Sequence, residues 1–162
     1  MFTGALAVSY YGRARTTVDV DVVVAVVDKG WRTKLVSALE RAGLVVDEER
    51  VDAALRSGYR IVTFEDSKSP LTVDIILSDV KLVRRAGSIL GLATFYQTPE
   101  YLILAKLRMI KATVPRERAL KDEDDVRAIL RFTEVDMETV KERAGRNNTV
   151  AILEEIVGGS PS

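Results

Sequence analysis

The chain has 162 residues, of which 47% are hydrophobic and 30% are charged, so it is long enough to bury a core of its own. It contains neither cysteine nor histidine, which excludes disulfides, zinc sites built on thiolate or imidazole ligands, thiol nucleophiles and catalysis by imidazole. Its 24 basic and 24 acidic residues give a formal net charge of zero, so the overall charge favours neither a membrane nor a nucleic acid as partner.

The first half of the sequence alternates between helical and extended patterns. A strand stub at Phe2 leads through Gly4 into a short helix, and a later run of valine and aspartate is typical of a buried strand. Two further strands flank a turn rich in serine and aspartate, which predicts a hairpin. In chain order the expected elements are a helix over Gly4–Tyr11, a strand over 18–27, helices over 31–42 and 48–56, and strands over 59–65, 71–77 and 89–96.

From residue 98 onward the pattern is helical, with helices expected over Pro99–Ala112, 118–132, 136–143 and 148–157. This order predicts an α+β fold in which a mixed β-sheet flanked by helices (1–97) carries a helical C-terminal part (98–162), together forming a single compact domain. No secretion signal follows Met1, so a cytoplasmic location is expected. Only three residues precede Gly4, whereas a strand normally has about five, so we also expect an apolar strand and a helix upstream in the same reading frame.

Three acids occur inside predicted strands. Asp19 and Asp21 share one face because they are two residues apart, and Asp74 lies in the aliphatic run Val73-Asp74-Ile75. Crowded carboxylates repel one another unless a cation neutralises them, and Mg²⁺ or Mn²⁺ with oxygen ligands does so. Two such ions about 4 Å apart can clamp both oxygens of a phosphoryl displacement. The alternative, commoner for an isolated Asp-x-Asp, is that Asp19 and Asp21 pair with Arg13, Arg15 or a helical lysine, or cap a turn.

Gly4 lies where the stub becomes a helix, and backbone N–H groups at such a point can bind a phosphate. Gly4-Ala5, Asp19-Val20-Asp21 and Val73-Asp74-Ile75 together resemble the motif of the nucleotidyltransferase superfamily related to polymerase beta, although Ala5 replaces the usual Gly or Ser. Gly12, Arg15 and Thr17 extend the resemblance to the minimal nucleotidyltransferase group that includes abortive-infection toxins of toxin–antitoxin pairs.

Lys106 stands at the centre of an apolar helical stripe. A buried ammonium needs a negative partner, which could be a triphosphate, the strand carboxylates or an aspartate at the edge of the core. The residues alone give these alternatives equal weight. The resemblance favours a role at the nucleotide, because a lysine on this helix belongs to the motif of the toxin-like group.

The segment Lys121-Asp122-Glu123-Asp124-Asp125 is similar to the Lys-Asp-x-x-Asp motif of the same group, in which these residues brace or enter the site. Lys121 and Asp125 are four residues apart, a spacing that allows an ion pair along a helix. Glu123 and Asp124 lie outside the motif and are expected on a solvated, charged face.

The resemblance implies an Mg²⁺-dependent enzyme that transfers a nucleoside monophosphate from a nucleoside triphosphate to an acceptor hydroxyl of RNA, protein or a small molecule. The alternative is a non-catalytic regulator that keeps the fold and binds another protein. In the enzyme, Asp19, Asp21 and Asp74 would be catalytic and hold the metal, with Asp74 also activating the acceptor. Nucleotide-binding residues would be Gly4, Ala5, Arg15, Thr17, Lys106 and Lys121, supported by Asp122 and Asp125.

Overall fold

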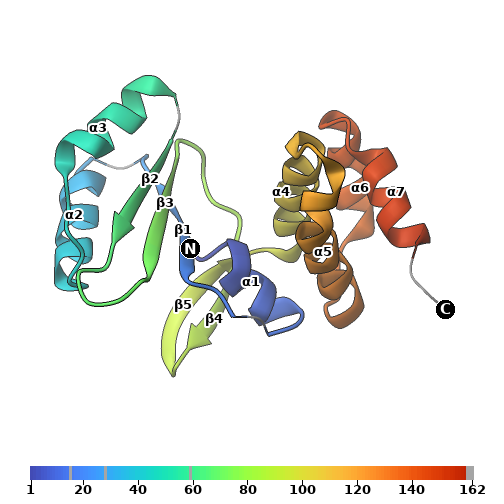
Figure 1. Cartoon of the computed structure of the whole chain (residues 1–162), viewed down its shortest axis with the longest axis horizontal. Helices are drawn as coiled ribbons and strands as arrows, with labels where there is room; N and C mark the ends of the chain where they lie inside the picture. The colour runs from blue at the N-terminus through green and yellow to red at the C-terminus, as the bar shows by residue number, and fades with distance from the viewer. Residues whose placement is uncertain (15, 28, 59, 160–162) are drawn as a thin grey trace. The chain divides into compact units, whose positions relative to one another are not determined.

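A computed structural model describes residues 1–14, 16–27, 29–58 and 60–159 (Figure 1). The α+β class expected from the sequence is confirmed. In chain order the elements are α1 (Gly4–Tyr11), β1 (Asp19–Ala25), α2 (Trp31–Arg41), α3 (Glu48–Ser57), β2 (Ile61–Glu65), β3 (Thr72–Ser78), β4 (Arg84–Ile89), β5 (Leu92–Gln97), α4 (Pro99–Ala112), the 3₁₀ helix η1 (Arg116–Ala119), α5 (Leu120–Phe132), α6 (Met137–Arg146) and α7 (Val150–Gly158).

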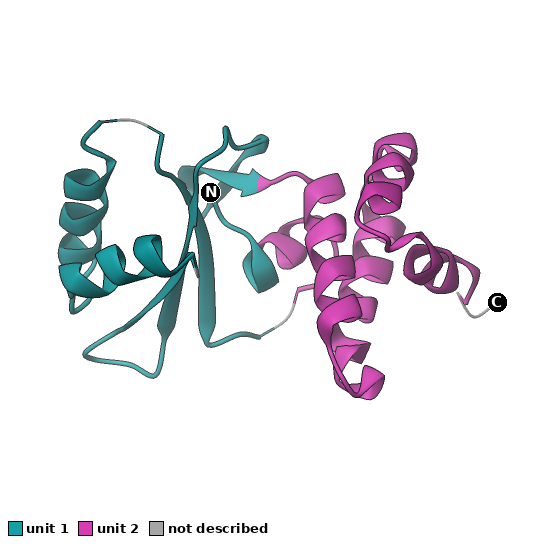
Figure 2. Cartoon of the chain, turned by 90° about the horizontal axis from the view of Figure 1, so that it is seen from above, with its two compact units in different colours: residues 1–6, 16–96 teal, residues 7–15, 97–162 magenta. Residues whose placement is uncertain are grey.

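The chain divides into two compact units, shown in different colours in Figure 2. Unit 1 contains residues 1–6 and 16–96, and unit 2 contains residues 7–15 and 97–162. The sequence placed a division at residue 98 within one compact domain, and it gave no sign that residues 7–15 group with the C-terminal helices. No helix in the described ranges is long and apolar enough to cross a bilayer.

The larger sheet of unit 1 has the strand order β1-β3-β2. Strands β1 and β3 are parallel, and β2 and β3 are antiparallel, so the sheet is mixed and the expected hairpin is present. The β-branched residues of β1 favour this extended state because they pack well on a pleated surface. Asp47 caps the start of helix α3, where its side chain accepts hydrogen bonds from the N–H groups of Glu49 and Arg50.

One face of this sheet forms the core of unit 1. Alternate strand residues, among them Phe64 and Ile75, pack against α2 and α3 through Leu39 and Val51. Because successive side chains in a strand point to opposite faces, the residues between them lie on the other face. That other face carries Asp19, Asp21 and Asp74. The alternation of polar and apolar residues thus determines which side of the sheet is covered.

The sequence predicted one strand over 89–96, whereas the structure has two, β4 and β5, joined at Leu90-Gly91. Strand β4 was missed because Arg84, Arg85 and the small residues after them show no alternation of apolar and polar side chains. The stub at the start of the chain lies between β5 and β1. Phe2 donates its N–H to the carbonyl of Phe95 at 2.8 Å, and Thr3 donates its N–H to the carbonyl of Asp21 at 3.0 Å.

Unit 2 is a helical bundle around α4. The apolar stripe of this helix is buried against α5, α6 and α7, through residues that include Leu107, Ile129, Val140 and Leu153. The predicted helix over 118–132 is shorter at its start, since residues Arg116–Ala119 form the 3₁₀ turn η1 before α5 begins. The last part of α1 belongs to this unit, and Thr133 donates its hydroxyl to the carbonyl of Tyr11.

Asp136 caps α6, and we expect this cap to make stability depend on pH. Its carboxylate accepts the N–H of Thr139 at 3.1 Å and its hydroxyl at 2.7 Å. The hydroxyl bond, followed by the backbone bond, lowers the pKa of Asp136 below its ordinary value of 3.8. A carboxyl whose folded pKa is depressed stabilises the protein above the unfolded pKa and loses that contribution as the pH falls through the folded pKa.

Asp136→Ala is therefore expected to lower Tm by a few degrees at neutral pH, with the difference shrinking as the pH falls below about 4. Asp136→Asn keeps an oxygen that can accept the N–H of Thr139, so it should retain part of the cap without the pH dependence. Thermal unfolding of the three proteins measures both effects. The pH range is from about 7 to about 3, which spans the pKa of an aspartate in the unfolded chain. A deficit in Asp136→Ala that is the same at every pH would contradict this account.

Candidate functional site

The three strand acids lie on the face of the larger sheet opposite to the one that packs on α2 and α3. In the parallel register, Asp21 lies opposite Asp74, and Asp19 lies opposite Thr72. In-register residues of neighbouring strands point to the same face, and Asp19 is two residues before Asp21. The fold therefore brings Asp21 and Asp74 to adjacent positions, with Asp19 one row away.

Two threonines donate hydrogen bonds to these carboxylates. Thr63 of β2 lies opposite Asp74 and donates its hydroxyl to Oδ1 of Asp74 at 2.6 Å. Thr72 donates its hydroxyl to Oδ1 of Asp19 at 2.7 Å. The sequence reasoning missed both threonines. Thr72 could have been found from its spacing, since it stands two residues before Asp74, but the partner of Thr63 depends on the register between strands.

A fourth acid lies on the same face. Glu65 is two residues after Thr63 in β2 and lies opposite Thr72, so Asp19, Thr72 and Glu65 form one row across the three strands. Asp21, Asp74 and Thr63 form the neighbouring row. Like charges on adjacent positions of a sheet repel one another, and a bound cation would relieve this repulsion.

Gly4 contacts this face directly. Its φ of +55° is a left-handed conformation that other residues avoid, and a Cβ at this position would overlap Oδ2 of Asp21 and lie 2.5 Å from its Cγ. The start of α1 therefore lies against the Asp21 carboxylate. The side chain of Ala5, the next residue, is buried.

We expect Gly4→Ala to lower the free energy of unfolding by about 2–4 kcal/mol, because it adds an unfavourable φ and a clash with Asp21. Gly43→Ala is the matched control. Gly43 also has a positive φ, +81°, but no atom lies within 4 Å of a Cβ there, so only the backbone cost of about 1–2 kcal/mol applies. Urea denaturation of the two variants separates the terms, and equal losses would show that the Asp21 side chain moves aside without cost.

The donor chemistry of the face suits a hard divalent ion, because Asp19, Asp21 and Asp74 supply carboxylate oxygens and the chain has no softer ligand such as cysteine or histidine. The side chains are not gathered as a finished site, however. Within the described ranges, no three acidic side chains converge on a position that could hold a metal ion. Asp19 would have to give up or share its bond to Thr72 to join Asp21 and Asp74.

The remaining residues predicted for the nucleotide differ in placement. Thr17 accepts the N–H of Asp19 at 3.1 Å, and its hydroxyl also reaches the carbonyl of Asp19 at 3.2 Å, so it shapes the start of β1. Arg15 lies outside the described residues. Lys121 is exposed on the first turn of α5 in unit 2, and its assignment to a nucleotide stays a prediction.

Lys106 pairs with two aspartates of its own unit. Its Nζ lies 2.6 Å from Oδ1 of Asp122 and 2.8 Å from Oδ2 of Asp125, and its side chain is only 13% exposed. This is the ion-pair alternative that the sequence left open. The two acids of the Lys-Asp-x-x-Asp segment thus pair with a lysine on α4.

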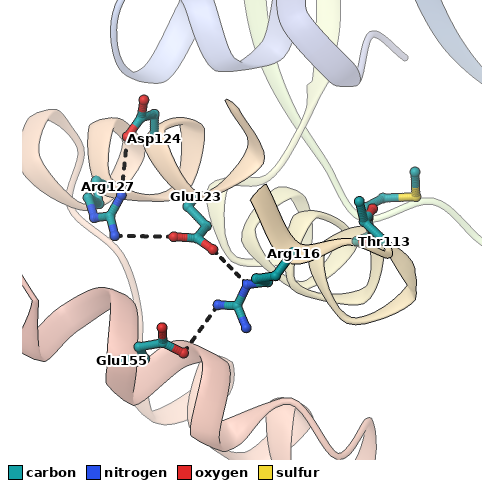
Figure 3. Close-up of polar contacts among 7 residues, drawn as sticks. Thr113, Arg116, Glu123, Asp124, Arg127 and Glu155 are labelled. Carbon is teal, nitrogen blue, oxygen red and sulfur yellow. Dashed lines mark hydrogen bonds and ion pairs between the residues drawn. The ribbon is translucent and has the colours of Figure 1, made fainter. Parts of the chain in front are cut away.

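Glu123 was expected on a solvated face, and that expectation is wrong. Its residue is only 6% exposed, and its carboxylate lies between Arg116 at 2.8 Å and Arg127 at 3.3 Å (Figure 3). Arg116 also contacts Glu155 of α7 at 3.2 Å, so the cluster links η1, α5 and α7. The hydrogen bond to Glu123 raises the pKa of Arg116 above its ordinary value. Asp124 is exposed, as expected.

No protein-family model matches the chain, and a search of curated proteins finds no match to it.

Proposed function

We propose that the chain is an Mg²⁺-dependent nucleotidyltransferase that acts in the cytoplasm. It would transfer a nucleoside monophosphate from a nucleoside triphosphate to an acceptor hydroxyl and release pyrophosphate. The observation that supports this most is the position of Asp21 beside Asp74, with Asp19 on the same face and the start of α1 against Asp21. Because the sequence motif resembles that of the abortive-infection toxins, the proposal favours a role as the toxin of a toxin–antitoxin pair.

The proposed roles follow from the hydrogen bonds of the sheet face. Asp21 and Asp74, joined by Asp19, would hold Mg²⁺, which when bound neutralises the carboxylates and the phosphate oxygens. Thr63 occupies Oδ1 of Asp74, so the other carboxylate oxygen is the one available to accept the proton of the acceptor hydroxyl. The acceptor oxygen would then form a bond to the α-phosphorus. The bond between the α-phosphorus and the oxygen that bridges the α- and β-phosphates would break, and pyrophosphate would leave.

The start of α1 would bind the phosphates. The first N–H groups of a helix have no partner inside the helix, and the helix dipole adds a partial positive charge there. Gly4 brings these groups next to Asp21, and Ala5 follows in the same turn. Because these contacts use the backbone, the replacement of the family's Gly or Ser by Ala5 removes only a hydroxyl contact.

The experiment is a transfer assay with nucleoside triphosphates labelled at the α-phosphate, incubated with Mg²⁺ and pools of RNA and protein. The proposal expects the α-label to enter one pool as pyrophosphate is released. In a parallel assay with nucleoside triphosphates labelled at the γ-phosphate, the label should remain in pyrophosphate. Transfer of the γ-label would identify a phosphotransferase instead and overturn the proposal.

A second candidate function is a non-catalytic regulator that binds another protein. The observation in its favour is that the acids of the described residues do not converge on a metal position. A ligand that binds only the native state raises Tm by mass action. If none of the four nucleoside triphosphates with Mg²⁺ shifts Tm, the regulator is favoured over the enzyme.

A further inference from the structure

The β4–β5 hairpin of unit 1 exposes large apolar side chains at its turn. Leu90 is 98% exposed and Leu92 is 70% exposed, and Phe95 further along β5 is also exposed. Single exposed apolar residues are common, but several on one projecting element indicate a contact surface. In Figure 1 the turn of this hairpin projects from unit 1 at the lower edge of the view.

The backbone at Leu90 is a second, independent sign. Leu90 has a φ of +49° and Gly91 a φ of +79°, which match the two central positions of a type I′ hairpin turn. Asparagine and glycine suit such a turn, whereas leucine in the left-handed region is strained. The first position therefore holds a residue that is unfavourable both for the turn and for exposure to water, and an apolar contact at the turn would offset the second cost.

The charge around the hairpin has one sign. From Val80 to Pro99 the chain carries Lys81, Arg84 and Arg85 and no aspartate or glutamate. Arg84 lies over the ring of Phe95, with 3.8 Å from Cζ to the ring centroid. The chain as a whole is neutral, so this segment is a local concentration of positive charge at the base of the hairpin whose turn exposes the leucines.

We propose that the hairpin docks on an anionic lipid surface. Leu90 and Leu92 would enter the boundary between headgroups and acyl chains, while Lys81 and Arg84, at the base of the hairpin, are attracted by the anionic headgroups. A lipid surface is the occupant that supplies negative charge and an apolar interior together. A second copy of the chain would bring like charges together, and leucines at the tip cannot stack on nucleic-acid bases as aromatic rings do.

The tight turn also lowers the cost of insertion. Backbone N–H and C=O groups that leave water must find partners, and a two-residue turn closes a hairpin with few such groups unpaired. The overall charge of the chain gave no reason to expect a membrane partner, and this inference concerns peripheral binding through one hairpin. It does not depend on the proposed nucleotidyl transfer.

The test is flotation of the full chain with vesicles of equimolar phosphatidylcholine and phosphatidylserine, or of phosphatidylcholine alone. We expect binding to the anionic vesicles only, weakened by salt. Leu90→Asn should weaken binding by about tenfold or more, because the apolar contact is lost. The same change places asparagine before Gly91, the sequence that a type I′ turn prefers, so Tm should rise. These opposite signs separate loss of docking from loss of folding.

Two further variants complete the test. Lys81→Gln with Arg84→Gln should weaken anionic-vesicle binding about fivefold per cation removed. Val45→Asn removes another exposed apolar side chain of unit 1, outside the hairpin, and should leave binding unchanged. The proposal is overturned if the parent chain fails to bind anionic vesicles, if Leu90→Asn binds them as well as the parent does, or if a single-stranded RNA oligonucleotide binds the hairpin in their place.

Discussion

Asp74→Asn is expected to lower the rate of nucleotidyl transfer by at least about a hundredfold while leaving the metal-free protein as stable as the parent or more stable. The substitution keeps an oxygen that can accept the hydroxyl of Thr63, so the strand contacts persist. It removes one of two negative charges on adjacent positions, because Asp74 lies opposite Asp21. Loss of activity without loss of stability therefore distinguishes a site from a structural contact.

Binding of the metal provides a readout that does not need the acceptor. Mn²⁺ or Mg²⁺ should raise Tm of the parent chain, and this rise should be absent in Asp74→Asn and in the double variant Asp19→Asn/Asp21→Asn. Glu65→Gln is the matched control, since it removes a negative charge from the same face, opposite Thr72, without touching the proposed ligands. Its metal response and activity should resemble those of the parent.

The outcome that rejects the site is equally specific. If Asp74→Asn is clearly less stable than the parent without metal, and neither protein responds to metal, the carboxylate is a structural partner in the sheet. The α+β fold would be unaffected by that result, but the proposed metal site would be lost.

Lys106→Met is expected to lower the free energy of unfolding by about 3 kcal/mol, because it removes the cation that pairs with Asp122 and Asp125. Asp125 is only 7% exposed and Asp122 only 22% exposed, so water compensates little for the loss. The apolar stripe of α4 taken alone would suggest the opposite, since methionine would complete it. The structure changes the expected sign because the lysine, although flanked by apolar residues, bonds to α5.

A triple variant tests the cause. Lys106→Met combined with Asp122→Asn and Asp125→Asn also replaces both carboxylates by neutral amides. This variant should recover most of the lost stability, because a neutral polar group costs less to bury than a carboxylate whose cation has been removed. Lys111→Met on the same helix is the control. Lys111 is exposed and donates a hydrogen bond to the carbonyl of Asn147 at 3.2 Å, so its loss should cost little. Denaturant unfolding measures all three, and equal effects for Lys106→Met and Lys111→Met would contradict the ion-pair explanation.

Much of the fold was predictable because its signals are local. The β-branched run identified β1, the turn rich in serine and aspartate identified the β2–β3 hairpin, and helical periodicity identified α4 with the bounds the structure has, from the Pro99 that starts it. Strand β4 was missed because its cations and small residues lack alternation, although the turn at Leu90-Gly91 separates it from β5. The 3₁₀ turn η1 was missed because its composition does not differ from that of a first helical turn.

The sequence by itself determined that Asp19 and Asp21 share a face, since a strand repeats every two residues, and that Lys106 lies on an apolar stripe, since a helix repeats every 3.6 residues as a rule. Only the tertiary structure decided what each of these groups meets. The register of β1 on β3 places Asp21 beside Asp74, and the packing of α5 on α4 gives Lys106 its two aspartates. The same packing buries Glu123 between two arginines. Periodicity along one helix or strand determines the direction in which a side chain points. The residue that it contacts lies on a second element far away in the sequence, and the packing of the whole core brings the two elements together.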